Sequence, residues 1–284
     1  MTAGRFAPSP SGDLHVGNLR TAILAWLFAR STGRDFLLRI EDLDRVRPGV
    51  QESQLRDLRA IGIDWDGPFV RQSDRAPLYA DAVAQLTAAG LVYECYCSRR
   101  EINEAPSAPH HPPGAYPGTC RDLTDAQREV RRSERPAALR LRATIGSQTV
   151  TDLLHGRVDG AVDDIVLMRN DGVPAYNLAV VVDDAEQGID QIVRGDDLLS
   201  SAPRQAYLAS LLGYAEPTYA HVPLALNAEG KRLAKRDGAV TFRELVSKGI
   251  DVRALILESI GMASVEDFDP TRLPREPWVF VPPA

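Results

Sequence analysis

The sequence lacks both an excess of positive charge and any long apolar run. Its 33 basic and 39 acidic side chains give a formal net charge of −6, which excludes a uniformly basic protein that coats nucleic acid. No apolar run approaches the roughly 20 residues that a membrane-spanning helix needs, and the N-terminus carries no apolar signal-peptide core. We therefore expect a cytoplasmic protein without a membrane segment.

Cysteine is scarce as well, with three residues in a chain of 284. This odd and small number excludes a disulfide framework, but Cys95, Cys97 and Cys120 lie close together in the sequence. Such clustering indicates either a metal site or reduced thiols that are simply buried. The remaining composition, 44% hydrophobic and 25% charged, is that of a globular protein with one large or two modest domains.

The first hundred residues alternate between strand and helix patterns. An apolar segment that starts at Arg5 is stopped by Pro8 and Pro10, and apolar residues then recur at helical spacing. The whole pattern predicts strands near residues 5–8, 36–40 and 91–97 and helices near 19–27, 55–61 and 73–86, the last one capped by Ser73. This alternation predicts an α/β fold with an open parallel sheet.

The composition changes between residue 98 and about 135, where proline, histidine, glycine and arginine replace periodic apolar residues. This change indicates an inserted, loop-rich subdomain. Beyond it, residues 138–143 alternate as a half-buried strand does, and apolar runs at 165–168 and 176–182 flank the turn-forming Asn170-Asp171-Gly172. The two runs therefore predict a β-hairpin that resumes the sheet.

The second half of the chain carries several helix boundaries. Gly213 can end a helix over residues 206–212. Two later helices are expected to begin at Thr241, with Glu244 as its capping-box partner, and at Asp251. The tail beyond them, rich in proline and charge, is expected to form an irregular strap.

The segment Pro8–Asn18 joins a predicted strand to a predicted helix. Free backbone N–H groups and the positive helix end meet there, as an anion site requires. The dinucleotide fingerprint is absent, and Gly12 and Gly17 have P-loop spacing but are followed by Asn18 in place of the P-loop lysine. From these residues alone, a proline-stiffened loop in which His15 merely packs is the favoured interpretation.

Two motifs in the right order resemble the class I aminoacyl-tRNA synthetases. The segment Pro8–Asn18 is similar to their HIGH signature, and Arg232–Arg236, which alone would be read as a solvated charged loop, stands where they carry the KMSKS loop. Gly4–Gly12 and Leu38–Asp44 resemble the glutamyl branch in particular, and the resemblance extends to about residue 260. It implies a Rossmann-type catalytic domain with a zinc-containing connective insertion and a short C-terminal helical stem.

The chain is accordingly expected to divide into four stretches. These are the first half of the catalytic domain (1–97), the inserted zinc-containing subdomain (98–137), the rest of the insertion with the second catalytic half (138–226), and the KMSKS-type loop with the stem (227–284). The chain ends soon after Arg236, so we expect no anticodon-binding domain.

In the resembled family an amino-acid carboxylate attacks the α-phosphorus of ATP in line, and the protein positions and neutralises the anions. The resemblance implies that ATP, with Mg²⁺, is bound by Pro8, Ser9, Gly12, His15, Gly17, Asn18, Arg232 and Lys235. His15 and Lys235 are the implied catalytic residues, which stabilise developing phosphate charge. Ala234 departs from the small hydroxyl residue that is usual there, so a hydrogen bond is lost while the charge remains.

A glutamate substrate brings two carboxylates and one ammonium group, so its site should pair both signs of charge. The resemblance implies that Arg5 and Arg194 contact carboxylates, Glu41 binds the ammonium, and Ser9 and Tyr176 add hydrogen bonds. Most of these residues stand at or just past the carboxyl ends of predicted strands, where open α/β sheets bind ligands. For Tyr176, packing in the core is an open alternative.

Bacterial members of the glutamyl branch hold zinc with Cys-x-Cys followed by Tyr-x₃-Cys, and the sequence reproduces this pattern. The resemblance therefore implies one structural Zn²⁺ bound by Cys95, Cys97, Tyr116 and Cys120. From the residues alone, His110, His111 or a water is an alternative fourth ligand.

Length and motifs together resemble the short members of the branch, which activate glutamate without tRNA and attach it to the queuosine base at position 34 of tRNA(Asp). The resemblance implies ATP, L-glutamate and queuosine-containing tRNA(Asp) as partners of a monomer. Two alternatives are a truncated glutamyl-tRNA synthetase that charges a tRNA 3′ end and a synthetase-like binding module without catalysis. Ala234 is the only feature of the sequence that favours the binding module.

Overall fold

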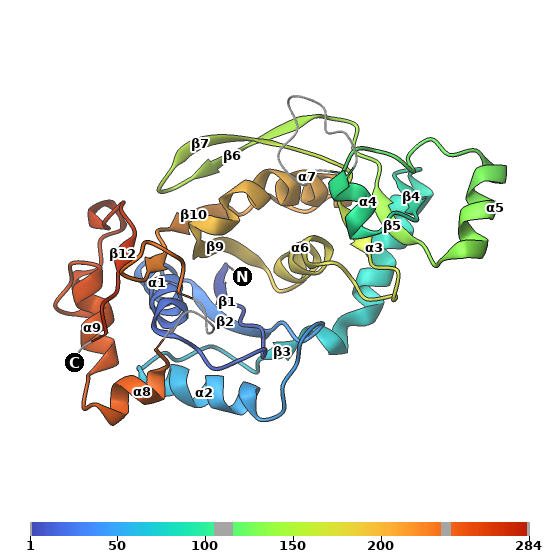
Figure 1. Ribbon diagram of the computed structural model, residues 1–284. Helices are drawn as coiled ribbons and strands as arrows, with labels where there is room; N and C mark the ends of the chain where they lie inside the picture. Colours follow the sequence, from blue (N-terminus) through green and yellow to red (C-terminus); the bar gives the residue numbers. More distant parts are fainter. Residues whose placement is uncertain (1, 105–115, 234–239, 283–284) are drawn as a thin grey trace.

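A seven-stranded sheet forms the centre of the computed structural model, which describes residues 2–104, 116–233 and 240–282 (Figure 1). Its strand order is β3-β2-β1-β9-β10-β6-β7, and every neighbouring pair is parallel except the antiparallel pair β6–β7. The strands are β1 (Ala3–Phe6), β2 (Asp35–Ile40), β3 (Val70–Arg71), β6 (Ser147–Asp152), β7 (Gly156–Ala161), β9 (Ile189–Gly195) and β10 (Thr218–Val222). The predicted α/β fold with a mostly parallel sheet is confirmed.

Helices cover both faces of this sheet, so alternate residues of a strand enter different apolar cores. Phe36 and Leu38 of β2 pack in the core that contains α1 (Val16–Ser31). Leu37 packs in the core that contains α7 (Ala202–Leu212). Between β1 and β9 the chain order reverses, because β2 lies on one side of β1 and β9 on the other. Parallel sheets bind ligands at such a switch point, beyond the carboxyl ends of the strands.

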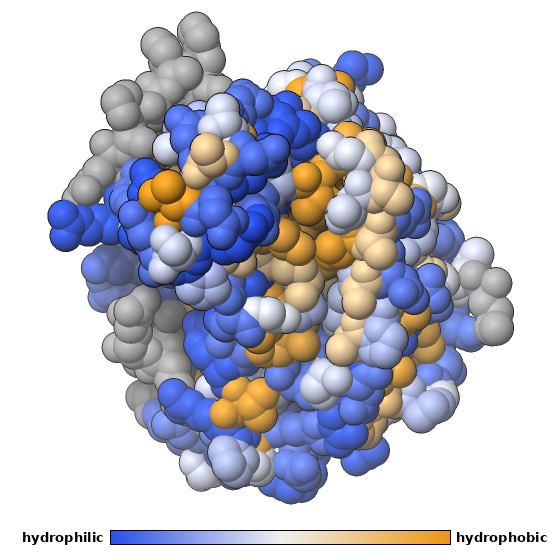
Figure 2. All heavy atoms as spheres, turned by 90° about the vertical axis from the view of Figure 1, so that its right-hand side faces the viewer, coloured by the Kyte–Doolittle hydropathy of each residue, from blue (hydrophilic) through white to orange (hydrophobic). Residues whose placement is uncertain are grey.

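A second, three-stranded antiparallel sheet belongs to the insertion. It is built from β4 (Val92–Cys95), β5 (Ala138–Leu141) and β8 (Val166–Met168), and α4 (Arg99–Glu104) and α5 (Asp125–Glu134) lie beside it (Figure 1). The strand near 91–97, expected in the parallel sheet, therefore pairs elsewhere. Seen from the side of the insertion, the surface is mostly hydrophilic, with apolar residues gathered near the middle of that face (Figure 2).

One predicted strand is wrong, because residues 176–182 form a helix. The turn at 170–172 is present, but only a single bridge between Met168 and Pro174 follows it, and α6 (Tyr176–Glu186) begins two residues later. Its apolar residues, including the β-branched run Val180–Val182, are buried on all sides between the sheet, α7 and α3 (Ala76–Ala88). Burial in this layer outweighs the strand preference of valine.

Other helix boundaries were predicted with mixed success. Gly213 ends α7, Thr241 and Glu244 form the capping box of α8 (Phe242–Ser247), and Asp251 caps α9 (Val252–Ser259), all as predicted. Ser73 does not cap α3. Its amide and hydroxyl both donate to the Asp42 carboxylate, and a short 3-10 turn precedes the helix.

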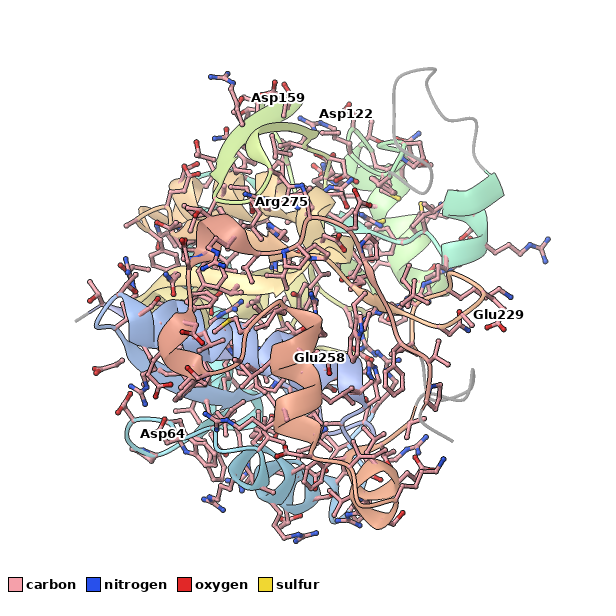
Figure 3. The ribbon with its side chains drawn as sticks, turned by 90° about the vertical axis from the view of Figure 1, so that its left-hand side faces the viewer. Asp64, Asp122, Asp159, Glu229, Glu258 and Arg275 are labelled. Carbon is pink, nitrogen blue, oxygen red and sulfur yellow. The ribbon has the colours of Figure 1, made fainter. Side chains whose placement is uncertain are left out.

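The C-terminal segment bonds to two earlier parts of the chain. Its strand β12 (Trp278–Val279) pairs in parallel with β11 (Ala225–Leu226), and Arg275, labelled in Figure 3, donates to the carbonyl oxygen of Leu154 at 2.6 Å. The expected strap is therefore joined both to the strand before the KMSKS-type loop and to the β6–β7 turn. In the part of the chain that the structure describes, no helix has the length and apolar character to cross a membrane.

Candidate active site and cysteine cluster

A cavity of about 980 Å³ opens at the carboxyl ends of β1 and β9. Nearly all residues that were predicted to bind ATP or glutamate line this cavity. They are Arg5, Pro8, Ser9, Gly12, His15, Gly17, Asn18, Glu41, Tyr176, Arg194 and Arg232. The structure thus brings together residues from four distant parts of the chain. Lys235 and Ala234 lie outside the described residues.

His15 caps the helix that begins at the signature loop. Its Nδ1 accepts the backbone N–H of Asn18 at 3.2 Å, and the Asn18 side chain in turn accepts the N–H of His15 at 3.3 Å. Burial, assisted by the nearby Arg232 guanidinium, lowers the pKa of His15 from 6.5 to about 4. Because Nδ1 is an acceptor, the ring is neutral near pH 7 and its proton resides on Nε2. His15 can thus donate a hydrogen bond to an anion but brings no cationic charge.

Gly17 lets the imidazole of His15 lie close to the helix. A Cβ at position 17 would stand 3.1 Å from ring atoms of His15 and 3.2 Å from the Cβ of Ala225. These distances are tighter than ordinary van der Waals contact, so an alanine there would displace the ring. The second glycine of the signature thus has a steric role.

Gln54 of α2 (Val50–Ala60) holds the signature loop from behind. Its side-chain amide donates to the carbonyl oxygens of Ser9 at 3.0 Å and Gly12 at 2.7 Å. Gln54 is almost fully buried, so these two bonds fix the loop backbone beside the cavity. Gln54 was not predicted as a site residue, because a glutamine on an amphipathic helix gives no signal of its partners.

Arg5 is buried and already has a carboxylate partner. Its Nε donates to Asp184 Oδ1 at 3.0 Å, and Arg39 Nη1 donates to the same oxygen at 2.8 Å. Although burial opposes ionisation, the two guanidinium groups hold the pKa of Asp184 below its ordinary value. The charge of Arg5 is therefore partly compensated inside the protein.

Glu41 directly follows β2 and lies between guanidinium groups. Its carboxylate is 3.5 Å from Arg39 Nη2, and burial raises its pKa against the opposing effect of Arg39 and Arg5. An ammonium group that entered the cavity would favour the ionised form of Glu41. Tyr176, at the first turn of α6, is 43% exposed and lines the cavity, so the alternative that it packs in the core is wrong.

Arg194 lies near the end of β9 and contacts a neutral partner. Its Nε donates to Nε2 of His221 at 3.0 Å, while its Nη1 is buried and has no hydrogen-bond partner among the described residues. A buried guanidinium nitrogen without a partner costs free energy, because its hydrogen bond to water is lost and not replaced. A ligand that enters the cavity could accept this hydrogen bond.

Arg232, the first residue of the KMSKS-type loop, is held at the rim of the cavity. Its Nη1 is 2.5 Å from a carboxylate oxygen of Asp197, which belongs to the 3-10 turn that follows β9. The segment that follows the loop is joined to the signature segment by backbone bonds, since the N–H of Val16 donates to Val240 and that of Phe242 to Leu14. The chain just beyond the loop thus lies against the signature segment.

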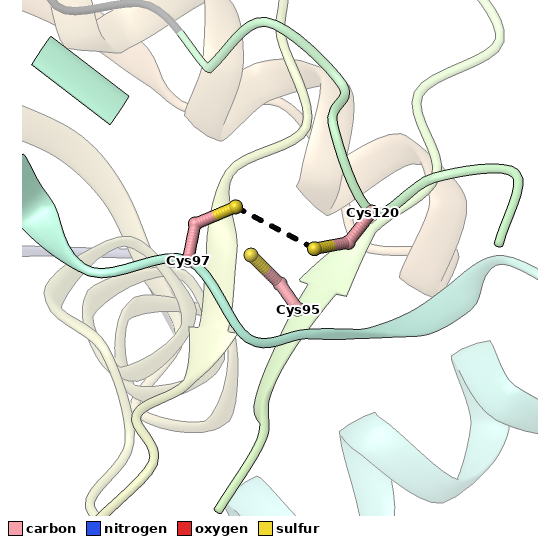
Figure 4. Close-up of side chains that lie close together, drawn as sticks. All are labelled: Cys95, Cys97 and Cys120. Carbon is pink, nitrogen blue, oxygen red and sulfur yellow. Dashed lines mark hydrogen bonds between the residues drawn. The ribbon is translucent and has the colours of Figure 1, made fainter. Parts of the chain in front are cut away.

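The three cysteines meet where the chain leaves β4 and enters the insertion (Figure 4). Their sulfur atoms lie within 4.8 Å of one another, and the Tyr116 hydroxyl oxygen is 3.4 Å from Cys95 Sγ and 3.7 Å from Cys97 Sγ. Ligands about 2.3 Å from a tetrahedral zinc are separated by roughly 3.8 Å, so this donor set fits such an ion. The cysteines are placed to bind a metal. His110 and His111 lie outside the described residues.

Tyr116 is anchored in this cluster by two further contacts. Its hydroxyl accepts the backbone N–H of Cys120 at 2.7 Å, and the Arg140 guanidinium lies 3.7 Å above its ring. The phenol oxygen is therefore fixed on the side of the three sulfur atoms, as a fourth ligand would have to be.

The geometry agrees with what the comparisons find. Residues 2–267 match the family model described as tRNA synthetases class I (E and Q), catalytic domain. A relative from Nocardia farcinica called glutamyl-Q tRNA(Asp) synthetase is 65% identical over 98% of this chain and 92% of its own. The chain belongs to the glutamyl-Q tRNA(Asp) synthetase family. A member from Cutibacterium acnes with the same name is 55% identical over 93% of this chain and 78% of its own.

Solved structures support the fold of this family member. The glutamate tRNA ligase of Elizabethkingia meningosepticum, crystallised in complex with its amino acid, is 26% identical with a TM-score of 0.81. The alignment covers 99% of this chain and 67% of that one. The glutamate-tRNA synthetase of Elizabethkingia anophelis gives nearly the same result, with a TM-score of 0.82 and 68% of its chain covered. The family thus shares the catalytic fold of class I synthetases.

Proposed function

We propose that the protein activates L-glutamate with ATP, without tRNA, and then transfers it to the queuosine base at position 34 of tRNA(Asp). In the first step a carboxylate oxygen of glutamate attacks the α-phosphorus and pyrophosphate leaves, which yields glutamyl-adenylate. In the second step a nucleophile of the queuosine base attacks the activated carbonyl carbon and AMP leaves. Membership in the glutamyl-Q tRNA(Asp) synthetase family supports both steps.

The arrangement of charged side chains in the cavity supports glutamate as the substrate. Two buried guanidinium groups, Arg5 and Arg194, and one partly buried carboxylate, Glu41, line the same cavity as the signature loop. Glutamate offers two carboxylates and one ammonium, which match these charges in number and sign. Ser9 and Tyr176 line the same cavity and would supply hydrogen bonds to the substrate.

ATP would lie against the signature loop. The free N–H groups at the start of α1, the Nε2–H of His15 and the cations Arg232 and Lys235 would surround its phosphates. Mg²⁺ would accompany ATP as part of the substrate complex and reduce the repulsion between phosphate oxygens. Because His15 is neutral, the positive charge in this set comes from the KMSKS-type loop and the metal.

We assign the cysteine cluster to one structural zinc. Three thiolates form a soft ligand set that prefers this ion, and Tyr116 is proposed as the fourth ligand. The ion would tie the strand β4 to Cys120 and so hold the insertion of residues 98–137 beside the catalytic domain. No step of the chemistry depends on it.

Pyrophosphate exchange into ATP tests the first step. Purified protein with glutamate, ATP and Mg²⁺, but no RNA, should exchange labelled pyrophosphate. Glutamine and aspartate serve as controls and should support little exchange. No exchange with any amino acid would favour the binding module without catalysis, and exchange only after tRNA is added would favour a tRNA-dependent glutamyl-tRNA synthetase.

A further inference from the structure

A buried chain of hydrogen bonds leads from Asp152 through His221 to Arg194. The His221 Nδ1 lies 2.7 Å from Asp152 Oδ2, and the Nε of Arg194 donates to His221 Nε2 at 3.0 Å. His221 and Arg194 are register partners on β10 and β9, and Asp152 is the last residue of β6. Three neighbouring strands of the sheet therefore fix this chain, which ends at the cavity.

The partners of His221 determine where its proton resides. Asp152 is a pure acceptor, since its two oxygens also accept the backbone N–H groups of His221, Leu154 and His155 at 2.8–3.0 Å. Nδ1 must therefore donate to Asp152, and Nε2 must offer its lone pair to Arg194. This tautomer is a neutral ring, and burial, with Arg194 nearby, keeps the pKa of His221 below its ordinary value.

A neutral acceptor has a consequence that a carboxylate would not have. It orients the guanidinium of Arg194 without neutralising it, and Nη1 remains buried without a partner among the described residues. Arg5 is the opposite case, because its Nε is bonded to the carboxylate of Asp184. Of Arg5 and Arg194, which both line the cavity, Arg194 therefore has the less compensated charge.

We infer that His221 is a positioning residue for glutamate recognition, which holds Arg194 in the orientation that binds a substrate carboxylate and leaves its charge available. This inference rests on the proposed function, because it takes glutamate to be the ligand of Arg194. It also predicts selectivity against glutamine. A neutral side-chain amide would leave the charge of Arg194 buried and unpaired.

Two substitutions of His221 separate its two contacts. His221→Asn keeps an amide where Nδ1 stands, so it can still donate to Asp152 but is too short to reach Arg194. His221→Gln places an amide oxygen where Nε2 stands, so it can accept from Arg194 but loses the bond to Asp152. The pair differs by one methylene, and both side chains are neutral. His155→Asn is a matched control, since in this chain of contacts the ring of His155 bonds only to the backbone oxygen of His221, and the substitution leaves in place the backbone N–H that donates to Asp152.

The test is glutamate-dependent pyrophosphate exchange, with KM for glutamate and for ATP measured separately. We expect His221→Asn to raise the glutamate KM by about tenfold or more, with kcat and the ATP KM within about threefold of the parent protein. His221→Gln and His155→Asn should keep the glutamate KM within about threefold. Circular dichroism and thermal melting of each variant accompany the kinetics.

Several results would overturn the inference. They are an unchanged glutamate KM in His221→Asn, an equal rise for both substrates, or a glutamate KM that is higher in His221→Gln than in His221→Asn. An Asn variant that fails to fold while the Gln variant folds would also overturn it, because the contact with Arg194 would then be structural. Failure of the proposed function is a separate outcome, since the parent protein itself would show no glutamate-dependent exchange.

Discussion

Arg5 and Asp184 form a buried ion pair across 179 positions of the sequence, with Arg5 Nε 3.0 Å from Asp184 Oδ1. The strand β1 supplies the arginine and the helix α6 supplies the carboxylate, which Arg39 shares at 2.8 Å. The same helix presents Tyr176 to the cavity at its other end. The pair thus links the position of α6 to the geometry of the proposed glutamate site.

We predict that Asp184→Asn destabilises the protein by about 3 kcal/mol, because two buried guanidinium groups lose their common counter-charge. Glutamate use should fall as well, since Arg5 would no longer be held in place. Urea denaturation followed by circular dichroism measures the first effect. The surface pair of Arg169 and Asp171 provides the control, and Asp171→Asn should leave the stability nearly unchanged because solvent screens this exposed pair. Equal stability of the two variants would contradict the role given to Asp184.

The lowered pKa of His15 predicts a pH dependence of stability. Between pH 6.5 and about 4 the unfolded chain takes up a proton at His15 that the folded protein does not bind, so the free energy of unfolding falls as the pH falls. Asp57 acts in the opposite direction, because burial raises its folded pKa to about 6. The comparison must therefore be made between the parent protein and a variant at position 15.

His15→Asn is the suitable variant, since asparagine can still cap α1 but does not titrate. From pH 7 to pH 4 the parent protein should lose roughly 1–3 kcal/mol more stability than the variant. Urea unfolding at a series of pH values gives this difference. Parallel curves for the two proteins would show that His15 titrates normally in the folded state.

The proposed zinc site predicts about one zinc per chain in protein purified without chelator. Cys97→Ser should remove the metal and loosen the insertion, with a smaller effect on pyrophosphate exchange because the cavity residues lie outside it. Tyr116→Phe deletes only the phenol oxygen, so the zinc content measured by mass spectrometry should fall if Tyr116 is a ligand. Full zinc content in Tyr116→Phe would instead assign the fourth position to another ligand. Absence of metal from the parent protein would contradict the zinc site itself.

Lys235 in the KMSKS-type loop is predicted to act in the transition state. Lys235→Ala should lower kcat for adenylate formation by about a hundredfold or more, while glutamate affinity stays within a few-fold, because the lost charge is proposed to stabilise the phosphates and not glutamate. Single-turnover kinetics and equilibrium binding of glutamate separate the two quantities. A variant in which only glutamate affinity changes would contradict the assignment.

The sequence predicted the part of the fold that depends on local signals. The strands β1 and β2, the capping box at Thr241 and the helix end at Gly213 follow from apolar spacing and capping chemistry. The helix α6 was missed, because Val180–Val182 favour a strand locally and only the layer of helices around them decides the outcome. The pairing of β4 was missed for the same reason, since strand partners are a long-range property.

For the candidate site, too, the sequence predicted some residues and missed others. Residues carried by motifs, such as His15, Glu41 and Arg194, line one cavity as the resemblance implied. Their supporting partners Gln54 and His221 were missed, because a buried hydrogen-bond partner far away in the sequence leaves no local pattern. The neutral state of His15 was missed as well, since it follows from burial and from its hydrogen bond to Asn18.

The transfer step tests the central claim most directly. Labelled glutamate, ATP and the protein are incubated with tRNA(Asp) that carries queuosine, with tRNA(Asp) that lacks it, and with tRNA(Glu), and the labelled RNA is then digested to locate the label. We expect label only in the queuosine-containing tRNA(Asp), on the anticodon fragment and not on the 3′-terminal nucleotide. Label on the 3′ end of tRNA(Glu), or equal labelling of tRNA(Asp) with and without queuosine, would contradict it.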